Sequence, residues 1–115
     1  MRKVKVMRGF TELFGEAEEA VGFFERLRGL TKATELADGY CLAFARCPRI
    51  HCHGMRIPID VITLTDTGLV IDVRTVEPGK LGPKLGGAYW ALECRAGRAA
   101  ELGIEKWQSL QIQPR

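Results

Sequence analysis

The sequence predicts a mainly β fold with a minor α content: an antiparallel β-sandwich or open barrel of six to seven short strands with two or three short helices. After Gly39 the chain is a series of short apolar or alternating runs, and turn residues separate these runs. Helical spacing of apolar residues is confined to short segments. The length of 115 residues, 46% of them hydrophobic, fits one domain over residues 1–115 with a single core.

The first third of the chain predicts one strand and most of the helical content. Residues 3–7 alternate between polar and apolar side chains, as a half-buried strand does. Residues 16–28 carry an acidic start, a basic end and an apolar stripe at helical spacing, so we expect a helix that stops at Gly29. A short helical turn is expected over residues 34–37. The apolar stripe consists of Ala17, Ala20, Val21, Phe24 and Leu27.

The remainder of the chain is expected to form mostly strands. Asp66-Thr67-Gly68 separates two apolar runs and indicates a hairpin. Residues 78–87 are rich in glycine and proline and predict a loop. Residues 96–102 predict a short helix that ends at Gly103. The expected strands cover residues 40–45, 50–53, 59–65, 69–76, 88–95 and 107–112.

Three motifs occur in order along the chain. Residues 25–30 read ERLRGL, residues 50–61 read IHCHGMRIPIDV, and residues 91–97 read ALECRAG, followed by AAELGI at 99–104. In this order and spacing, over approximately residues 24–112, they resemble the prokaryotic family catalogued as domain of unknown function 192. The resemblance implies a compact, mainly β, sandwich-like fold with a few short helices. It brings no established reaction, substrate or cofactor.

The resemblance also singles out polar residues. Arg56, Asp60 and Glu93 match the polar positions of the family motifs, and Arg28 matches the arginine of the first motif (Arg26 if the register slips). Carboxylates among the apolar residues of a strand are seldom buried without a partner. Together with His51 they are the candidate ligand-binding residues. The alternative is an internal arginine–carboxylate network that only holds the strands in register.

His51 and His53 would share one face of a strand, with Cys52 on the other. Two imidazoles at this spacing can bind zinc, but a zinc site needs a third or fourth ligand, and the chain contains no further histidine. In the resembling family the position of His53 is usually aromatic. The sequence therefore favours ordinary strand histidines, and we expect no metal and no cofactor.

Three functions of different classes fit these residues. The first is a non-catalytic small β domain that binds a polar small molecule, such as a sugar, or a protein partner, through His51, Arg56, Asp60 and Glu93. The second is a hydrolase-like enzyme in which His51 acts as base and Asp60 or Glu93 orients it. The third is a structural or assembly accessory. Aromatic residues could stack on a sugar, but their low abundance favours core anchors: Tyr89, Trp90 and Trp107.

Charge and composition narrow the expected partners. The net charge is +3, and a basic group at the N-terminus is answered by acidic residues soon after it, which indicates solvated faces rather than a nucleic-acid surface. No apolar stretch is long enough for a membrane span, and no secretory signal is visible, so we expect a cytoplasmic protein, monomeric or homodimeric, that binds neither nucleic acid nor membrane. The four cysteines should then mostly be free thiols.

Overall fold

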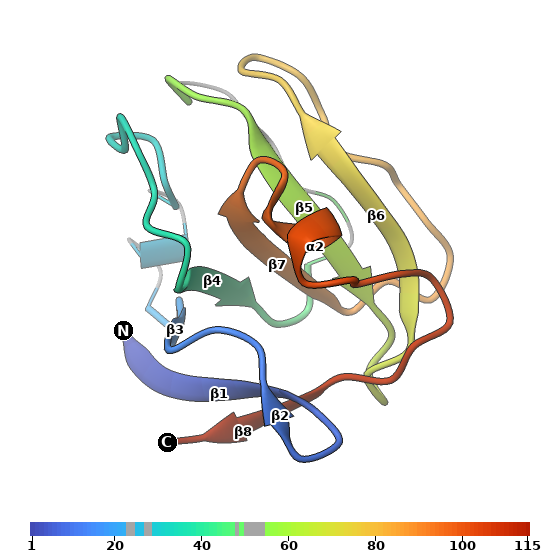
Figure 1. Ribbon diagram of the computed structural model, residues 1–115. Coiled ribbons are helices and arrows are strands. Elements are labelled where there is room, and N and C mark those ends of the chain that lie inside the picture. Colours follow the sequence, from blue (N-terminus) through green and yellow to red (C-terminus); the bar gives the residue numbers. More distant parts are fainter. Residues whose placement is uncertain (23–24, 27–28, 48, 50–54) are drawn as a thin grey trace.

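The computed structural model describes the chain except for residues 23–24, 27–28, 48 and 50–54. Eight strands form one sheet in the order β2-β1-β3-β4-β7-β5-β6, with β8 also paired to β1, and the sheet curls into a half-barrel (Figure 1). The strands are β1 (Arg2–Arg8), β2 (Thr11–Glu12), β3 (Glu16–Glu19), β4 (Tyr40–Phe44), β5 (Ile59–Leu64), β6 (Val70–Val76), β7 (Trp90–Arg95) and β8 (Gln111–Pro114). The prediction of a mainly β fold is confirmed.

The sheet is mixed, so the expectation of an antiparallel sheet was wrong at one place. Strands β3 and β4 run parallel, with Glu16 opposite Tyr40 and Glu19 opposite Ala43. A further backbone bond from Ala20 N–H to the Ala43 carbonyl, 3.0 Å long, continues this pairing beyond the strands. A parallel pair needs a crossover of a dozen or more residues. Residues 20–39 supply that crossover, where the sequence predicted a helix and a turn.

Residues 16–19 form a strand, although the apolar spacing predicted the start of a helix there. In β3, Ala17 and Glu19 are buried, while Glu18 is half-buried. The reason is the neighbouring strand, because β1 aligns Arg2 with Glu19 and Lys3 with Glu18. Cross-strand pairs of opposite charge stabilise a sheet. The basic and acidic residues near the N-terminus therefore lie on paired strands.

The expected two or three helices are not borne out. In the described part of the chain, one helix has both its ends defined: α2 (Arg98–Glu101), which lies inside the predicted range 96–102. Glu25 and Arg26 are helical, but they lie between residues that are not described. Residues 34–37 contain a bend and no helix. Across the residues that the structure describes, none of the helical segments has the length and apolar character that crossing a membrane requires.

Most strands of the second half confirm their predictions, and β5 and β6 form the expected hairpin around Asp66-Thr67-Gly68. The last strand starts later than expected, at Gln111 rather than at residue 107. Trp107 has a φ of +77°, which breaks an extended conformation at that point. The expected strand at residues 50–53 lies outside the described residues.

The C-terminal segment closes the curl of the sheet. Its Trp107 N–H donates to the Val70 carbonyl at 2.8 Å, and Leu110 N–H donates to the Gly68 carbonyl at 2.9 Å. It then continues as β8 and pairs with β1 (Figure 1). The segment thus joins the start of β6, at one edge of the sheet, to β1 near the other edge.

Each face of the sheet carries its own apolar cluster. The inner cluster fills the curl and draws on β1, β4, β5, β6 and β7 together with Leu13, Phe14, Ile104 and Leu110. The outer cluster lies on the opposite face, where Leu30, Ala33 and Leu36 of the crossover and Met55 and Ile57 cover it. Two clusters, rather than one core, explain why β4, β5 and β7 are buried on both faces.

The closure depends on a glycine, and this can be tested by Gly68→Ala. Gly68 has a φ of +94°, and a Cβ there would lie 2.0 Å from the backbone oxygen of Leu110. We expect the free energy of unfolding to fall by about 3 kcal/mol or more, because a backbone contact cannot give way easily. Urea denaturation measures this loss.

Gly79→Ala is the matched control. Gly79 has a φ of +80°, and no atom lies within 4 Å of the position that an added methyl carbon would take, so only the conformational cost of about 1 kcal/mol is expected. Equal losses for the two variants would contradict the importance of the close approach between Gly68 and Leu110.

Candidate functional site

The structure does not bring the sequence-predicted site residues together. Asp60 and Glu93 lie on neighbouring strands, but Asp60 is opposite Cys94, and Glu93 is opposite Val61. Successive residues of a strand point to opposite faces, so the two carboxylates lie on different sides of the sheet. Arg56 is exposed in the segment before β5. His51, His53 and Arg28 lie outside the described residues, so the pairing of His51 with a carboxylate stays a prediction.

Asp60 holds the helix against the sheet. Its Oδ1 accepts a hydrogen bond from the Thr75 hydroxyl at 2.7 Å. Its Oδ2 accepts the backbone N–H groups of Gly97 at 3.0 Å and Ala99 at 3.1 Å. These donors lie at the start of α2, where backbone N–H groups have no partner within the helix. These contacts give Asp60 a structural role, but its partners are a hydroxyl and backbone N–H groups rather than the arginine of the expected network.

Glu93 lies in the middle of the sheet with Leu42 and Val61 as its cross-strand neighbours. It is 4% exposed, and its Oε1 has no hydrogen-bond partner among the described residues. Burial raises the pKa of Glu93 to about 8, because the apolar surroundings disfavour the charged carboxylate. Glu93 is therefore mainly protonated at neutral pH.

The described cysteines are free thiols, as expected. Burial raises the pKa of Cys94 to about 12 and raises that of Cys41 well above its ordinary value. Both belong to the inner cluster. Protonated, buried thiols are poor nucleophiles, so these two act as core side chains. Where the chain is described, no three His, Cys, Asp or Glu side chains gather as metal ligands would.

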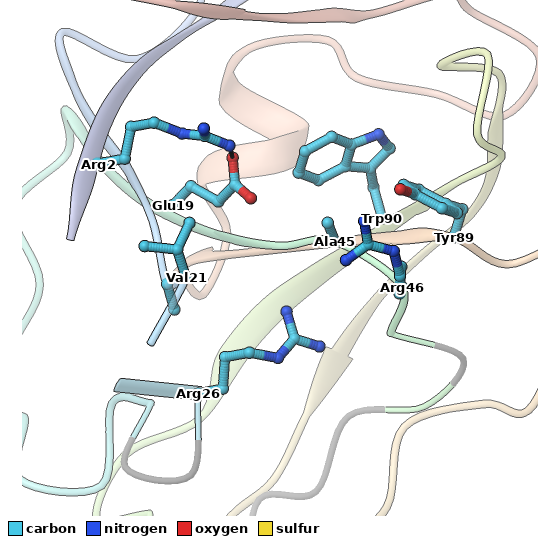
Figure 2. Close-up of a pocket in the computed structure, with 9 residues that line it drawn as sticks. Arg2, Glu19, Val21, Arg26, Ala45, Arg46, Tyr89 and Trp90 are labelled. Carbon is cyan, nitrogen blue, oxygen red and sulfur yellow. Dashed lines mark hydrogen bonds and ion pairs between the residues drawn. The ribbon is translucent and has the colours of Figure 1, made fainter. Parts of the chain in front are cut away.

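A different place in the fold does bring polar groups together. Strands β3 and β4 are parallel, so their C-terminal ends lie side by side, and the chain continues from them as Ala20-Val21 and Ala45-Arg46. The antiparallel neighbours β1 and β7 begin at the same edge of the sheet. A pocket of about 470 Å³ opens there (Figure 2). Its described lining consists of Arg2, Glu19, Ala20, Val21, Arg26, Ala45, Arg46, Tyr89 and Trp90.

One ion pair forms a wall of this pocket. The Arg2 guanidinium donates to Glu19 Oε1 at 2.7 Å, and the Glu19 side chain is only 8% exposed. A carboxylate this deeply buried needs such a partner, because the loss of water would otherwise disfavour its charge. The positive charge of Arg2 thus compensates the negative charge of Glu19.

Two further guanidinium groups face the pocket. Arg26 lies over the ring of Phe44, with its central carbon 5.8 Å from the ring centre. Arg46 lies two residues beyond the end of β4 and has a φ of +51°, a conformation that costs a non-glycine residue roughly 1 kcal/mol. Figure 2 shows the two side chains pointing toward one another across the pocket. Neither pairs with a carboxylate among the described residues.

Aromatic side chains form the remaining wall. The rings of Tyr89 and Trp90 meet edge to face, with centroids 5.6 Å apart. Backbone bonds hold this point of the chain, since Tyr89 N–H donates to the Leu64 carbonyl and Cys47 N–H to the Tyr89 carbonyl, both at 2.8 Å. Trp107, the third aromatic named from the sequence, is 68% exposed and does not line the pocket.

Sequence reasoning missed most of the pocket. It named Arg26 only as an alternative to Arg28, and it interpreted Arg2 and Glu19 as solvated charges. Arg46 carried no signal, because neither its position after a strand nor its spacing is unusual. The opposite charges of residues 2–8 and 12–19 were the available signal for the ion pair. This signal would have indicated the pair only if residues 16–19 had been predicted as a strand.

Comparisons with known proteins identify a family and two solved structures that resemble this chain. A family model, DUF192, described as Uncharacterized ACR, matches residues 6–112. A crystal structure of a protein of unknown function from Novosphingobium aromaticivorans superposes with a TM-score of 0.79 at 26% identity, covering 95% of this chain and 83% of that one. No curated protein matches this chain.

A second crystal structure shares the fold. It is described as a candidate transcription regulator from Sinorhizobium meliloti and superposes with a TM-score of 0.78, covering 96% of this chain and 92% of that one. Its identity to this chain is 18%, so the likeness concerns the fold alone.

The role of Asp60 can be tested with Asp60→Asn. The amide oxygen can keep the Gly97 and Ala99 N–H groups and the NH2 group can donate to the Thr75 hydroxyl, but all these bonds lose the added strength that a charged carboxylate gives them. We expect unfolding to become easier by about 2 kcal/mol. Asp66→Asn, in the exposed turn of the hairpin, is the control and should change stability little. A similar, small effect of both variants in urea denaturation would contradict the structural role of Asp60.

Glu93 predicts a pH dependence of stability. Its folded pKa of about 8 lies above the ordinary value of 4.5, so the folded state keeps a proton that the unfolded state has lost. The contribution of Glu93 is complete below about pH 4.5 and is lost as the pH rises toward 8, by about 1.4 kcal/mol per pH unit at most.

Glu93→Gln removes this titration. Denaturation of both proteins between pH 5 and pH 9 should therefore show the variant gaining stability over the natural chain as the pH rises. Parallel stability curves for the two proteins would show that Glu93 titrates normally in the folded state.

Proposed function

This chain belongs to the DUF192 family, described as Uncharacterized ACR, and from that premise we propose that it is a non-catalytic β domain that binds a small polar molecule in the pocket of Figure 2. The single observation behind the proposal is the convergence of two guanidinium groups and an aromatic wall on one cavity at the ends of β3 and β4. A concave site with a few directed polar groups and an apolar wall is typical of small-molecule binding.

Size and wall chemistry support a small ligand. A cavity of about 470 Å³ lies within the usual range for small-molecule sites, roughly 300–1,000 Å³. Arg26 and Arg46 offer N–H donors, while Trp90 and Ala45 offer apolar surface. A sugar presents hydroxyl groups at its rim and C–H groups on its faces, so it could use both kinds of wall.

The same lining favours binding over catalysis. Glu19 is the carboxylate of the described lining, and its Oε1 already accepts a hydrogen bond from Arg2. The hydrolase alternative required His51 beside Asp60 or Glu93. The carboxyl groups of both residues are engaged or buried away from this pocket.

The proposal can be tested by a thermal-shift screen supported by fluorescence. The chain contains two tryptophans, so Trp107→Phe leaves Trp90 as the sole indole reporter at the pocket. A ligand at about 100 times its Kd stabilises the folded state by about 2.7 kcal/mol. We expect at least one compound of a panel of sugars, sugar acids, sugar phosphates and nucleosides to raise Tm by several degrees and change the Trp90 emission.

A blocking variant locates the binding. Val21 lines the pocket and is 50% exposed, so Val21→Trp should fill the mouth without disturbing the core and should abolish the thermal shift. Leu81→Trp is the matched control, because Leu81 is 51% exposed and lies outside the pocket lining. A panel without any shift, or a shift that survives Val21→Trp, would overturn the proposal.

A further inference from the structure

The charge of the pocket is unbalanced. Its described lining holds three guanidinium groups and one carboxylate. Arg2 and Glu19 neutralise each other at 2.7 Å, which leaves the charges of Arg26 and Arg46 uncompensated within the described lining. Arginine is charged at all physiological pH values, so the cavity carries a lasting excess of positive charge.

Arg26 is held in place by an aromatic ring. Its guanidinium lies over the face of Phe44, which belongs to the outer cluster. Stacking occupies the flat face of a guanidinium, whereas its N–H donors lie in the plane and stay available. The charge acts on its surroundings: burial raises the pKa of the nearby Cys47 thiol, and the positive Arg26 counteracts part of that rise.

Arg46 reaches the pocket because of an unusual backbone conformation. Its φ of +51° lies in the left-handed region, which glycine adopts more easily. With this backbone conformation, the Arg46 side chain extends from beyond the end of β4 across the cavity toward Arg26 (Figure 2). The local strain is therefore coupled to the position of the guanidinium.

We infer that the ligand of this pocket is a small organic anion whose carboxylate or phosphate group is bound jointly by Arg26 and Arg46, while the body of the ligand packs against Trp90. This inference rests on the proposed function and names its ligand class. Two guanidinium groups present planar forks of N–H donors that match the oxygens of a carboxylate or a phosphate. Arg26 is half-buried and Arg46 is exposed, so water and salt screen their attraction for an anion in part.

Other occupants fit the pocket less well. A neutral sugar would leave both positive charges without a counterion, and a cation would be repelled. A nucleic-acid backbone needs a row of basic residues along a surface, whereas these guanidinium groups converge on one cavity. The convergence favours one compact anionic group.

The experiment compares matched neutral and anionic probes. Glucose is paired with glucuronate and glucose 6-phosphate, and benzyl alcohol with benzoate and benzyl phosphate. Binding to the Trp107→Phe protein is measured by Trp90 fluorescence and calorimetry at low and high salt. We expect at least one anionic probe to bind about tenfold more tightly than its neutral partner, with an affinity that falls as salt rises.

Arg46→Gly is the decisive variant. Glycine suits the φ of +51°, so Tm should stay unchanged or rise while the preference for the anionic probe is lost. Arg46→Lys keeps the charge without the fork and should retain part of the preference. Lys106→Ala removes one exposed positive charge outside the pocket lining and should leave binding unchanged.

The outcomes separate the two proposals. If a neutral probe binds as tightly as its anionic partners, the pocket is a ligand site and the anion inference is overturned. If Arg46→Gly keeps the anion preference, or Lys106→Ala removes it, the anion is bound elsewhere and the inference also fails. If no probe of either kind binds, both the proposed function and this inference are overturned.

Discussion

The fold depends on the contact that closes the curled sheet. Residues 107–110 pair with the start of β6, and the chain then pairs with β1 as β8. This segment covers the inner cluster, to which Leu110 itself contributes. The backbones approach so closely that Gly68 has no room for a side chain. Without that approach, the apolar side chains on the concave face of β5 and β6 would meet water at their open edge.

The pocket follows from the one parallel pair in the described sheet. Because β3 and β4 run in the same direction, both strands end at the same end of the sheet, where β1 and β7 begin. A fully antiparallel sheet would have joined neighbouring strands by hairpins there, leaving less open space. The crossover of residues 20–39 therefore does two things: it covers the outer cluster, and it carries Arg26 to the rim of the cavity.

Asp60 and Glu93 show how much of a site a motif can predict. The sequence identified both as carboxylates within apolar strands, and both are indeed buried. Their roles differ because each faces a different side of the sheet. Asp60 meets the amide groups at the start of α2, whereas Glu93 meets aliphatic side chains and keeps its proton. Strand register decides this, and register depends on residues far apart in sequence.

By itself, the sequence determined the strands of the second half, the hairpin at Asp66-Thr67-Gly68 and the short helix near residue 98, because apolar runs and turn residues act locally. Tertiary structure decided the rest. Residues 16–19 became a strand because β1 and β4 offer hydrogen bonds on both sides, which outweighs a helical spacing. Arg26 and Arg46 are twenty residues apart and share a pocket only because two parallel strands end together, a consequence of pairing that no local pattern encodes.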